Sequence, residues 1–274
     1  MIRISRLLPL LALLLIPAGL SAAENPRLAK LLDRKPNIIF ILADDLGYGD
    51  LGCYGQKKFK TPNIDRLAAE GMRFTQCYAG STVCAPSRAV LMTGQHSGHV
   101  RIRGNADVPL LPEDVTVAEV LKDAGYETGV FGKWGLGDVG STGIPISQGF
   151  NEWFGYLDQT HAHDYYPTQL YRNEFIYPLE KNANGQKGQY SHDLFSMVAS
   201  NFVRVNKTRP FFMYLAYTIP HANNELGKAK GNGMEVPSDE PYSREDWPQT
   251  EKNKAAMMAR LDRDVGALLD QLKA

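Results

Sequence analysis

The sequence predicts an α/β fold with a mostly parallel central sheet flanked by helices. Three apolar runs, at 36–43, 126–131 and 210–216, are rich in β-branched and aromatic residues, as buried strands are. Segments with helical periodicity lie between them, and parallel strands need such crossover connections. The chain has 274 residues, of which 43% are hydrophobic, and this is enough to enclose a large core.

The N-terminal 23 residues have the features of a secretory signal peptide. Two arginines, Arg3 and Arg6, precede a leucine-rich run at 7–16 and small residues at 20–23. We therefore expect an exported protein, periplasmic or secreted, and a run too short for a stable membrane span. Residues 24–35 are expected to be a polar linker. The formal charge is zero and no long run of like charges occurs, so nothing indicates a nucleic-acid surface.

The remaining elements follow in order. The first run, 36–43, is interpreted as a central strand buried on both faces, followed by a glycine-spaced loop. A helix is expected from Thr61 to about Glu70, where Gly71 stops it, and then a strand at 72–78. Further helices are expected after Cys84 and at 115–124, 191–205 and 251–273. Long loops with short strands are expected at 138–190, and a polar loop after His221.

Cys84 is expected at or just before the N-terminus of a helix that Gly94 closes. Pro86 suits the first helical turn, and the unpaired N–H groups of that turn attract anions. Arg88, on the same turn, adds a permanent charge. The sequence therefore predicts either a reactive cysteine above an anion site or a buried cysteine before an ordinary helix. Ser87 is a rival nucleophile, but it lacks the Gly-x-Ser-x-Gly elbow of serine hydrolases.

Asp44 and Asp45 follow the first strand, at its carboxyl end. Two adjacent carboxylates repel each other unless a cation lies between them, and oxygen ligands favour calcium or magnesium. A solvated turn is the alternative interpretation.

Lys133 and His221 also follow predicted strands, where α/β folds bind their ligands. A lysine there can bind an anion, and a histidine can donate a proton to a leaving group. A surface lysine and a loop histidine bonded to backbone are the alternatives.

His161 and His163 lie in a loop rich in tyrosine. Such a pair can bind zinc, but the sequence shows no further ligand cluster. The three cysteines are an odd number for an exported protein, so at least one is expected to be unpaired or modified. A bridge between Cys53 and Cys77 is conceivable, and the sequence does not establish it.

Several of these residues stand in motifs that occur in order over residues 36–274. The motifs are Asp44-Asp45-Leu46-Gly47, Thr61-Pro62-Asn63-Ile64-Asp65, Cys84-Ala85-Pro86-Ser87-Arg88, Gly132-Lys133-Trp134 and Pro220-His221. In this combination the chain resembles the type I sulfatase (arylsulfatase-like) family of the alkaline phosphatase superfamily.

The resemblance implies a role for each of these residues. Cys84 would be oxidised to formylglycine (3-oxoalanine) by a formylglycine-generating enzyme, and its aldehyde hydrate would be the nucleophile. Asp44, Asp45 and the modified Cys84 would coordinate calcium, in preference to magnesium. Arg88 would stabilise the hydrate, Lys133 would bind the sulfate, and His221 would act as general acid.

Two departures from the family pattern carry further expectations. Family members commonly have a histidine where this chain has Gly135, and that histidine helps to release sulfate. We expect His161, or else His163, to take over its role and to bind substrate with Lys133 and His221. The second departure is that later metal ligands and a later substrate lysine of the family are missing. Residues 36–274 are therefore expected to be the N-terminal part of a catalytic domain, with weak calcium affinity and little turnover alone.

The resemblance implies a sulfuric ester hydrolase, and the aromatic loop 153–166 favours a sulfated carbohydrate as substrate. A phosphomonoester or phosphonate hydrolase of the same superfamily is one alternative. An inactive fragment that binds sulfated glycans is another, although binding alone would not require Cys84.

Overall fold

The computed structural model describes residues 35–106 and 108–274. Its strands are β1 (Ile38–Ala43), β2 (Glu127–Lys133), β3 (Glu152–Tyr156), β4 (Gln169–Arg172), β5 (Phe175–Pro178) and β6 (Phe211–Tyr217). Its α-helices are α2 (Pro62–Glu70), α3 (Cys84–Thr93), α4 (Val117–Asp123), α5 (Ser191–Val205), α6 (Asn224–Lys230) and α7 (Gln249–Lys273). The predicted signal peptide at 1–23, and all but the last residue of the predicted linker, lie outside the described residues.

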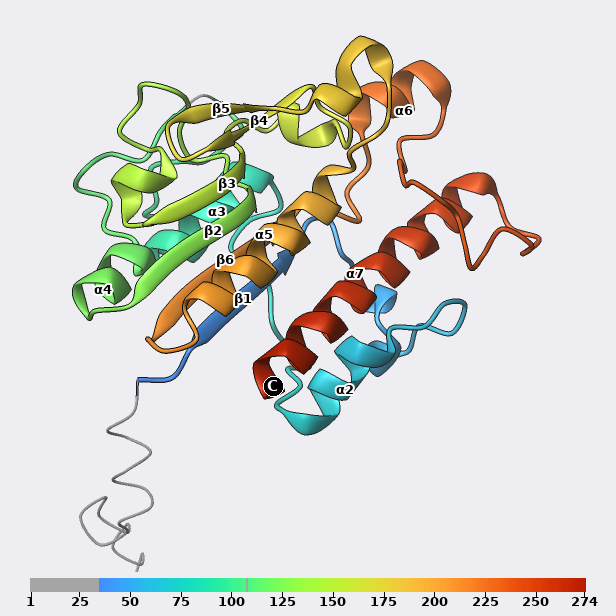
Figure 1. Ribbon diagram of the computed structural model, residues 1–274, viewed down its shortest axis with the longest axis horizontal. Coiled ribbons are helices and arrows are strands. Elements are labelled where there is room, and N and C mark those ends of the chain that lie inside the picture. Colours follow the sequence, from blue (N-terminus) through green and yellow to red (C-terminus); the bar gives the residue numbers. More distant parts are fainter. Residues whose placement is uncertain (1–34, 107) are drawn as a thin grey trace, which may run out of the picture. The chain divides into compact units, whose positions relative to one another are not determined.

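The strands form one sheet in the order β1-β6-β2-β3-β4-β5. The first four of these are parallel, and β4 and β5 add an antiparallel edge. The predicted fold class is therefore confirmed. Figure 1 shows helix α5 lying across one face of this sheet, with α3 and α4 on the other.

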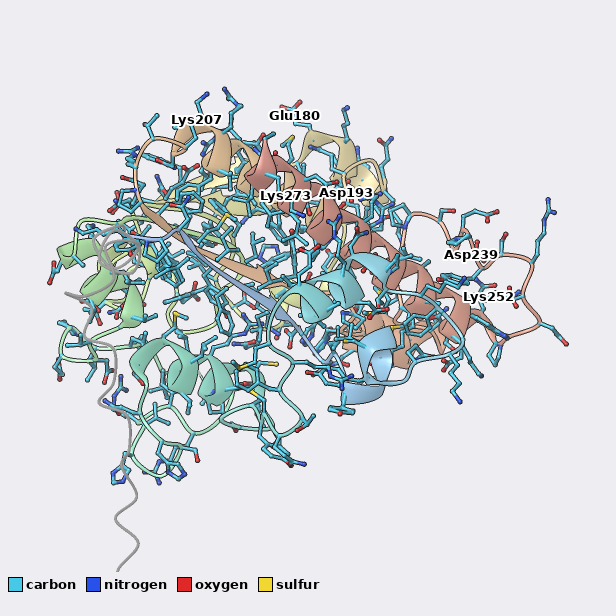
Figure 2. All side chains as sticks on the ribbon, turned by 90° about the horizontal axis from the view of Figure 1, so that it is seen from below. Glu180, Asp193, Lys207, Asp239, Lys252 and Lys273 are labelled. Atoms are coloured by element: carbon cyan, nitrogen blue, oxygen red, sulfur yellow. The ribbon has the colours of Figure 1, made fainter. Side chains whose placement is uncertain are left out.

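Two hydrophobic cores cover the two faces of the sheet. Strand β6 contributes Met213 and Leu215 to the core beneath α5 and α7, and Phe212 and Tyr214 to the core beneath α3 and α4. This alternation is the two-residue period of a strand buried on both faces. Charged side chains such as Glu180 and Lys207 stand at the periphery (Figure 2).

Strand β1 is less buried than the sequence predicts. Among the described residues it pairs only with β6, and most of its side chains are half-buried, while Phe40 is 40% exposed. The prediction of a central strand buried on both faces is wrong for this part of the chain. A continuous apolar run reports that a strand is hydrophobic, but not how many strands flank it.

The predicted strand at 72–78 is also wrong. The segment has no regular structure, and Met72, Phe74 and Tyr78 are exposed. Its apolar alternation would suit a strand, but strand geometry needs a neighbouring ladder, and none of the described strands pairs with it. Helix α6 lies where the sequence predicts a polar loop, so that prediction is wrong for residues 224–230. Asn223 caps its first turn and Gly231 ends it.

A buried carboxylate joins helices α7 and α2. Asp262 of α7 is 3% exposed and accepts hydrogen bonds from the backbone N–H groups of Asn63 and Ile64, at 3.0 and 2.8 Å. Those N–H groups belong to the first turn of α2, which has no side-chain cap of its own. Asp262 therefore acts as the N-cap of a helix about 200 residues earlier, because capping requires only an acceptor in place.

In the part of the chain that the structure describes, no helix is both long enough and apolar enough to span a membrane.

Candidate active site

Neighbouring strands and one helix end bring the predicted site residues together. Asp44 directly follows β1, Lys133 ends β2, and His221 follows β6, which lies between those two strands. The carboxyl ends of parallel strands share one edge of a sheet, so these side chains converge there. Cys84 is the first residue of α3, as the sequence predicts. The structure thus assembles residues that are up to 177 positions apart (221 − 44).

Asp44, Arg88 and Lys133 form a buried ionic network. The Oδ2 atom of Asp44 accepts hydrogen bonds from Lys133 Nζ at 2.9 Å and from Arg88 Nη2 at 3.1 Å. Arg88 also donates to the Lys133 carbonyl oxygen at 2.6 Å and to the Tyr214 hydroxyl at 3.3 Å. Arg88 and Lys133 are each only 1% exposed. Each charge in this network is therefore paired, as buried charges must be.

The network fixes the charge state of its members. Burial tends to raise the pKa of Asp44, but the cations of Arg88 and Lys133 outweigh it and lower the pKa below its ordinary value. Two cations share this one carboxylate, so the network has a positive excess. An oxyanion placed beside it would be stabilised without any rearrangement of the donors.

Cys84 and His221 form the second part of the site. A hydrogen bond with His221 lowers the pKa of the Cys84 thiol, burial opposes this, and Lys133 lowers it further. Burial tends to lower the pKa of His221, whereas Cys84 and Asp44 raise it above the ordinary value. The Nδ1 atom of His221 lies 2.6 Å from the Ala222 carbonyl oxygen. Nδ1 therefore carries a proton, and Nε2 is the atom that faces the site.

Asp45 points to the same side as Asp44 because its backbone leaves strand geometry. Its φ of +57° is left-handed, which is uncommon for a residue other than glycine. Its Oδ2 atom lies 3.3 Å from His221 Nε2, and its side chain is 66% exposed. The pair thus consists of one buried and one open carboxylate at the same edge of the sheet.

The donor atoms of this site can be tested against a calcium ion. One oxygen of Asp44, Cys84 Sγ and one ring nitrogen of His221 lie within 4.8 Å of one another. Calcium is a hard cation that binds oxygen, so sulfur is a poor ligand for it. Oxidation of Cys84 to an aldehyde hydrate would replace that sulfur with oxygen. Together with the two aspartates, the modified side chain would then fit calcium.

The two histidines of the aromatic loop have different positions. The His163 ring stacks on His221 with 4.7 Å between the ring centroids, and its Nδ1 lies 3.0 Å from Glu225 Oε2. His161 instead contacts Tyr156, edge to face, and lies 3.9 Å from Asp158. The described contacts therefore join His163, and not His161, to the cluster around Cys84. Both histidines belong to a single 3-10 turn, His161–His163.

Sequence reasoning missed several residues of the site. Asn105 accepts a hydrogen bond from the Ala85 N–H at 2.9 Å and so caps the first turn of α3. Tyr214 meets Arg88 through its hydroxyl, and its place on the β6 face toward α3 could have indicated this. Gln159 lies over Gly135, where its side-chain N–H donates to the Gly135 carbonyl oxygen at 3.1 Å. No sequence signal pointed to Asn105 or Gln159.

The three cysteines are all free in the structure. Cys53 and Cys84 are half-buried and Cys77 is exposed. Cys53 and Cys77 are therefore not bridged here.

Comparisons with known proteins agree with this geometry. The family model for sulfatases matches residues 36–274. The chain belongs to the sulfatase family. It is 46% identical to human arylsulfatase A over 166 residues, which is 57% of this chain and 30% of that protein. It is 34% identical to the N-acetylgalactosamine-6-sulfatase of Canis lupus familiaris over 239 residues, which is 77% of this chain and 43% of that protein. The chain thus spans less than half the length of these sulfatases.

Solved structures share the fold of the chain. The chain superposes on Ps i-CgsB with a TM-score of 0.71 at 33% identity, over 88% of this chain and 55% of that one. Another structure of Ps i-CgsB is a complex with k-i-k-neocarrahexaose. The phosphonate monoester hydrolase of Agrobacterium radiobacter has a TM-score of 0.56 at 18% identity, which is a likeness of fold alone.

Proposed function

We propose that the protein is a sulfuric ester hydrolase that removes sulfate from carbohydrate. The observation that carries this proposal is the meeting of Cys84, Asp44 and His221 within 4.8 Å, beside the buried cations of Lys133 and Arg88. This arrangement supplies a position for a nucleophile, paired cations for an oxyanion and a proton donor for a leaving group. Those are the three requirements of ester hydrolysis.

Arg88 and Lys133 bind and orient the sulfate group in this proposal. Their side chains are buried and held by Asp44, so they lose little freedom when the anion binds. Both cations also stabilise the charge that grows on the sulfate oxygens during transfer. Removing either cation is therefore expected to slow the chemical step as well as to weaken binding.

His221 donates the proton that the departing sugar oxygen needs. Its raised pKa keeps a proton available near neutral pH, as a general acid requires. Its Nδ1 is held by the Ala222 carbonyl, so the ring presents Nε2 to the site. The products are a free hydroxyl on the sugar and inorganic sulfate, and one water molecule is consumed overall.

A modified residue and a metal ion complete the proposed site. Formylglycine, made from Cys84 by a formylglycine-generating enzyme, would supply a hydroxyl nucleophile, and calcium would neutralise negative charge on the sulfate. Asp44, Asp45 and the modified residue 84 would hold the ion. Calcium is proposed in preference to magnesium because magnesium demands a stricter ligand geometry.

Sulfated carbohydrate is the proposed substrate class. Relatives with at least 34% identity are named N-acetylgalactosamine-6-sulfatase or N-acetylgalactosamine-6-O-sulfatase, and Ps i-CgsB was solved in complex with k-i-k-neocarrahexaose. Residues 36–274 are proposed to be part of a sulfatase catalytic domain in an exported protein, periplasmic or secreted. The basic start and the apolar run of residues 1–23 support export.

The proposal is tested with the protein co-expressed with a formylglycine-generating enzyme. We expect peptide mass spectrometry to show that Cys84 has lost its sulfur, and a chromogenic aryl sulfate to be cleaved in the presence of calcium, at the low rate expected of residues 36–274 alone. The Cys84→Ala variant should lose turnover by at least about 10³-fold, since the nucleophile is gone. Cys77→Ser is the matched control, because Cys77 is exposed and lies outside the site.

A matched aryl phosphate distinguishes the main alternative. Sulfate and phosphate esters are similar in shape, and Arg88 and Lys133 would attract either anion. Faster cleavage of the phosphate would assign the protein to the phosphomonoester or phosphonate hydrolases. An unmodified Cys84 with retained binding of a sulfated glycan would instead indicate a binding protein.

A further inference from the structure

A cavity of about 310 Å³ lies beside the proposed sulfate site. Its wall includes Asn105, whose side chain caps the residue after Cys84, and Gly135, two residues after Lys133. The cavity therefore adjoins the chain segments that carry Cys84 and Lys133. Its volume is at the lower end of the range for small-molecule pockets, which suits one sugar unit.

The side chain of Gln159 lines this cavity and fills the space above Gly135. Gly135 has a φ of +75°, and a β-carbon built on it would lie 1.8 Å from Gln159 Nε2. A residue larger than glycine at position 135 would have to displace the flexible end of the Gln159 side chain. In this geometry the space above Gly135, two residues after Lys133, is filled from position 159.

The amide of Gln159 is only half satisfied. Its Nε2 donates to the Gly135 carbonyl oxygen, while its Oε1 is shielded from solvent and has no donor among the described residues. A buried acceptor without a partner costs stability, on the order of 1–3 kcal/mol. A ligand in the cavity can supply that donor when the amide turns its Oε1 toward the cavity that Gln159 lines.

The other polar side chains of the wall define what the cavity accepts. Asp138 and Asp158 supply two carboxylates, and Thr160 a hydroxyl. None of the described lining residues carries a positive charge. The cavity therefore favours hydroxyl and N–H donors and repels a second anionic group, in contrast to the cationic site beside it.

We propose that Gln159 is a specificity-determining residue that binds a hydroxyl or amide N–H of the sugar bearing the scissile sulfate, and that the cavity selects a sugar with no second anionic group. This inference rests on the proposed sulfatase function and deepens it. Gln159 orients the uncharged side of the sugar, while Lys133 and Arg88 hold its sulfate. The preference for a singly sulfated unit follows from the two carboxylates, which a second sulfate would approach.

The experiment compares a monosulfated sugar, its disulfated counterpart and a small aryl sulfate. We expect the wild type to prefer the monosulfated sugar over the disulfated one by roughly tenfold in kcat/KM. Gln159→Ala should raise KM for the monosulfated sugar by roughly three- to tenfold, the worth of one hydrogen bond, with kcat within about twofold. Cleavage of the aryl sulfate should change by less than about twofold. Gln186→Ala is the matched control, since Gln186 is exposed.

A thermal unfolding measurement separates this role from a structural one. Gln159→Ala removes an unsatisfied acceptor, so its Tm should not fall, although substrate binding does. If the alanine variant does not fold, Gln159→Met gives the same test, because methionine has a similar length but carries neither the amide oxygen nor the amide N–H groups. An unchanged KM in the variant that folds, or a wild-type preference for the disulfated sugar, overturns the inference.

The proposed function and this inference can fail separately. If the wild type cleaves no sulfate ester, the proposed function fails, and calorimetry with the desulfated sugar then decides the inference. Weaker binding by Gln159→Ala supports it, and equal binding by wild type and variant overturns it.

Discussion

The candidate site has two walls that differ in how firmly they are held. One wall is the buried ionic network of Asp44, Arg88 and Lys133, whose members are 9%, 1% and 1% exposed. The other is a rim formed by Asp45, His163 and His221, in which the Asp45 side chain is 66% exposed. The first wall has its donors fixed before any ligand arrives, whereas the second combines the exposed Asp45 with the 6% exposed His221. A site of this kind grips an anion on one side and admits a variable group on the other.

The largest expected effect comes from breaking the buried wall. Arg88→Ala leaves Asp44 and the Tyr214 hydroxyl with one partner fewer in a buried position. We expect a loss of about 3–5 kcal/mol in the free energy of unfolding, and at least about 10²-fold in kcat, measured by denaturant titration and steady-state kinetics. Arg101→Ala is the matched control. Its ion pair with Asp114 is partly exposed, so its loss should stay under about 1 kcal/mol. Similar losses in the two variants would contradict the comparison.

The next effect concerns the two histidines of the aromatic loop. The sequence favours His161 as the replacement for the family histidine absent at position 135, but only His163 stacks on His221. We therefore propose that His163 takes this role, so His163→Ala should show a burst of product followed by a turnover slowed by about 10²-fold. His161→Ala is the matched variant. Normal steady-state turnover in His163→Ala together with a burst in His161→Ala would return the role to His161.

A smaller effect separates the two adjacent carboxylates. Asp45 holds a left-handed backbone conformation, so Asp45→Gly should raise the free energy of unfolding by up to about 1 kcal/mol while it lowers calcium affinity. Asp44→Gly should instead destabilise the protein, because it leaves Arg88 and Lys133 buried without their anion. Chemical unfolding and calcium titration measure both. A stability loss in Asp45→Gly equal to that in Asp44→Gly would show that the two positions are equivalent.

The smallest effect is a difference in pH dependence, measured with a chelator present. Burial lowers the pKa of His163, and Glu225 opposes this without cancelling it. The unfolded state therefore binds more protons below about pH 6.5, and stability falls as pH drops through that region. The pKa of Asp44 is also lowered, so its contribution is present above about pH 4 and lost below it. The contribution of His163 should thus be lost before that of Asp44, while His221, whose pKa is raised, opposes the loss in the same pH range.

The variant His163→Asn tests that order. Its free energy of unfolding should fall less than that of the wild type between about pH 6.5 and pH 4, with both curves falling below pH 4. Parallel curves across the whole range would mean that His163 does not titrate differently on folding.

The sequence predicted the parts of the site that follow from local rules. A strand end or a helix start places Asp44, Cys84, Lys133 and His221, and the parallel topology brings such ends together. Burial of β1 and pairing of 72–78 depend on which strands lie alongside, and no local pattern reports that. Gln159 was missed for a similar reason. Its place is set by the space above Gly135, which exists only in the folded chain.

The capping of α2 by Asp262 has a consequence for the order of events during synthesis. The N–H groups in the first turn of α2 have no capping acceptor until Asp262 emerges from the ribosome, about 200 residues later. A contact of such long sequence separation forms late and slowly, because the chain loses the entropy of closing a large loop before the contact can stabilise it. The two ends of the described unit are thus expected to dock in its final folding step. Until then, α2 and the apolar side chains beneath it stay open to chaperones and proteases.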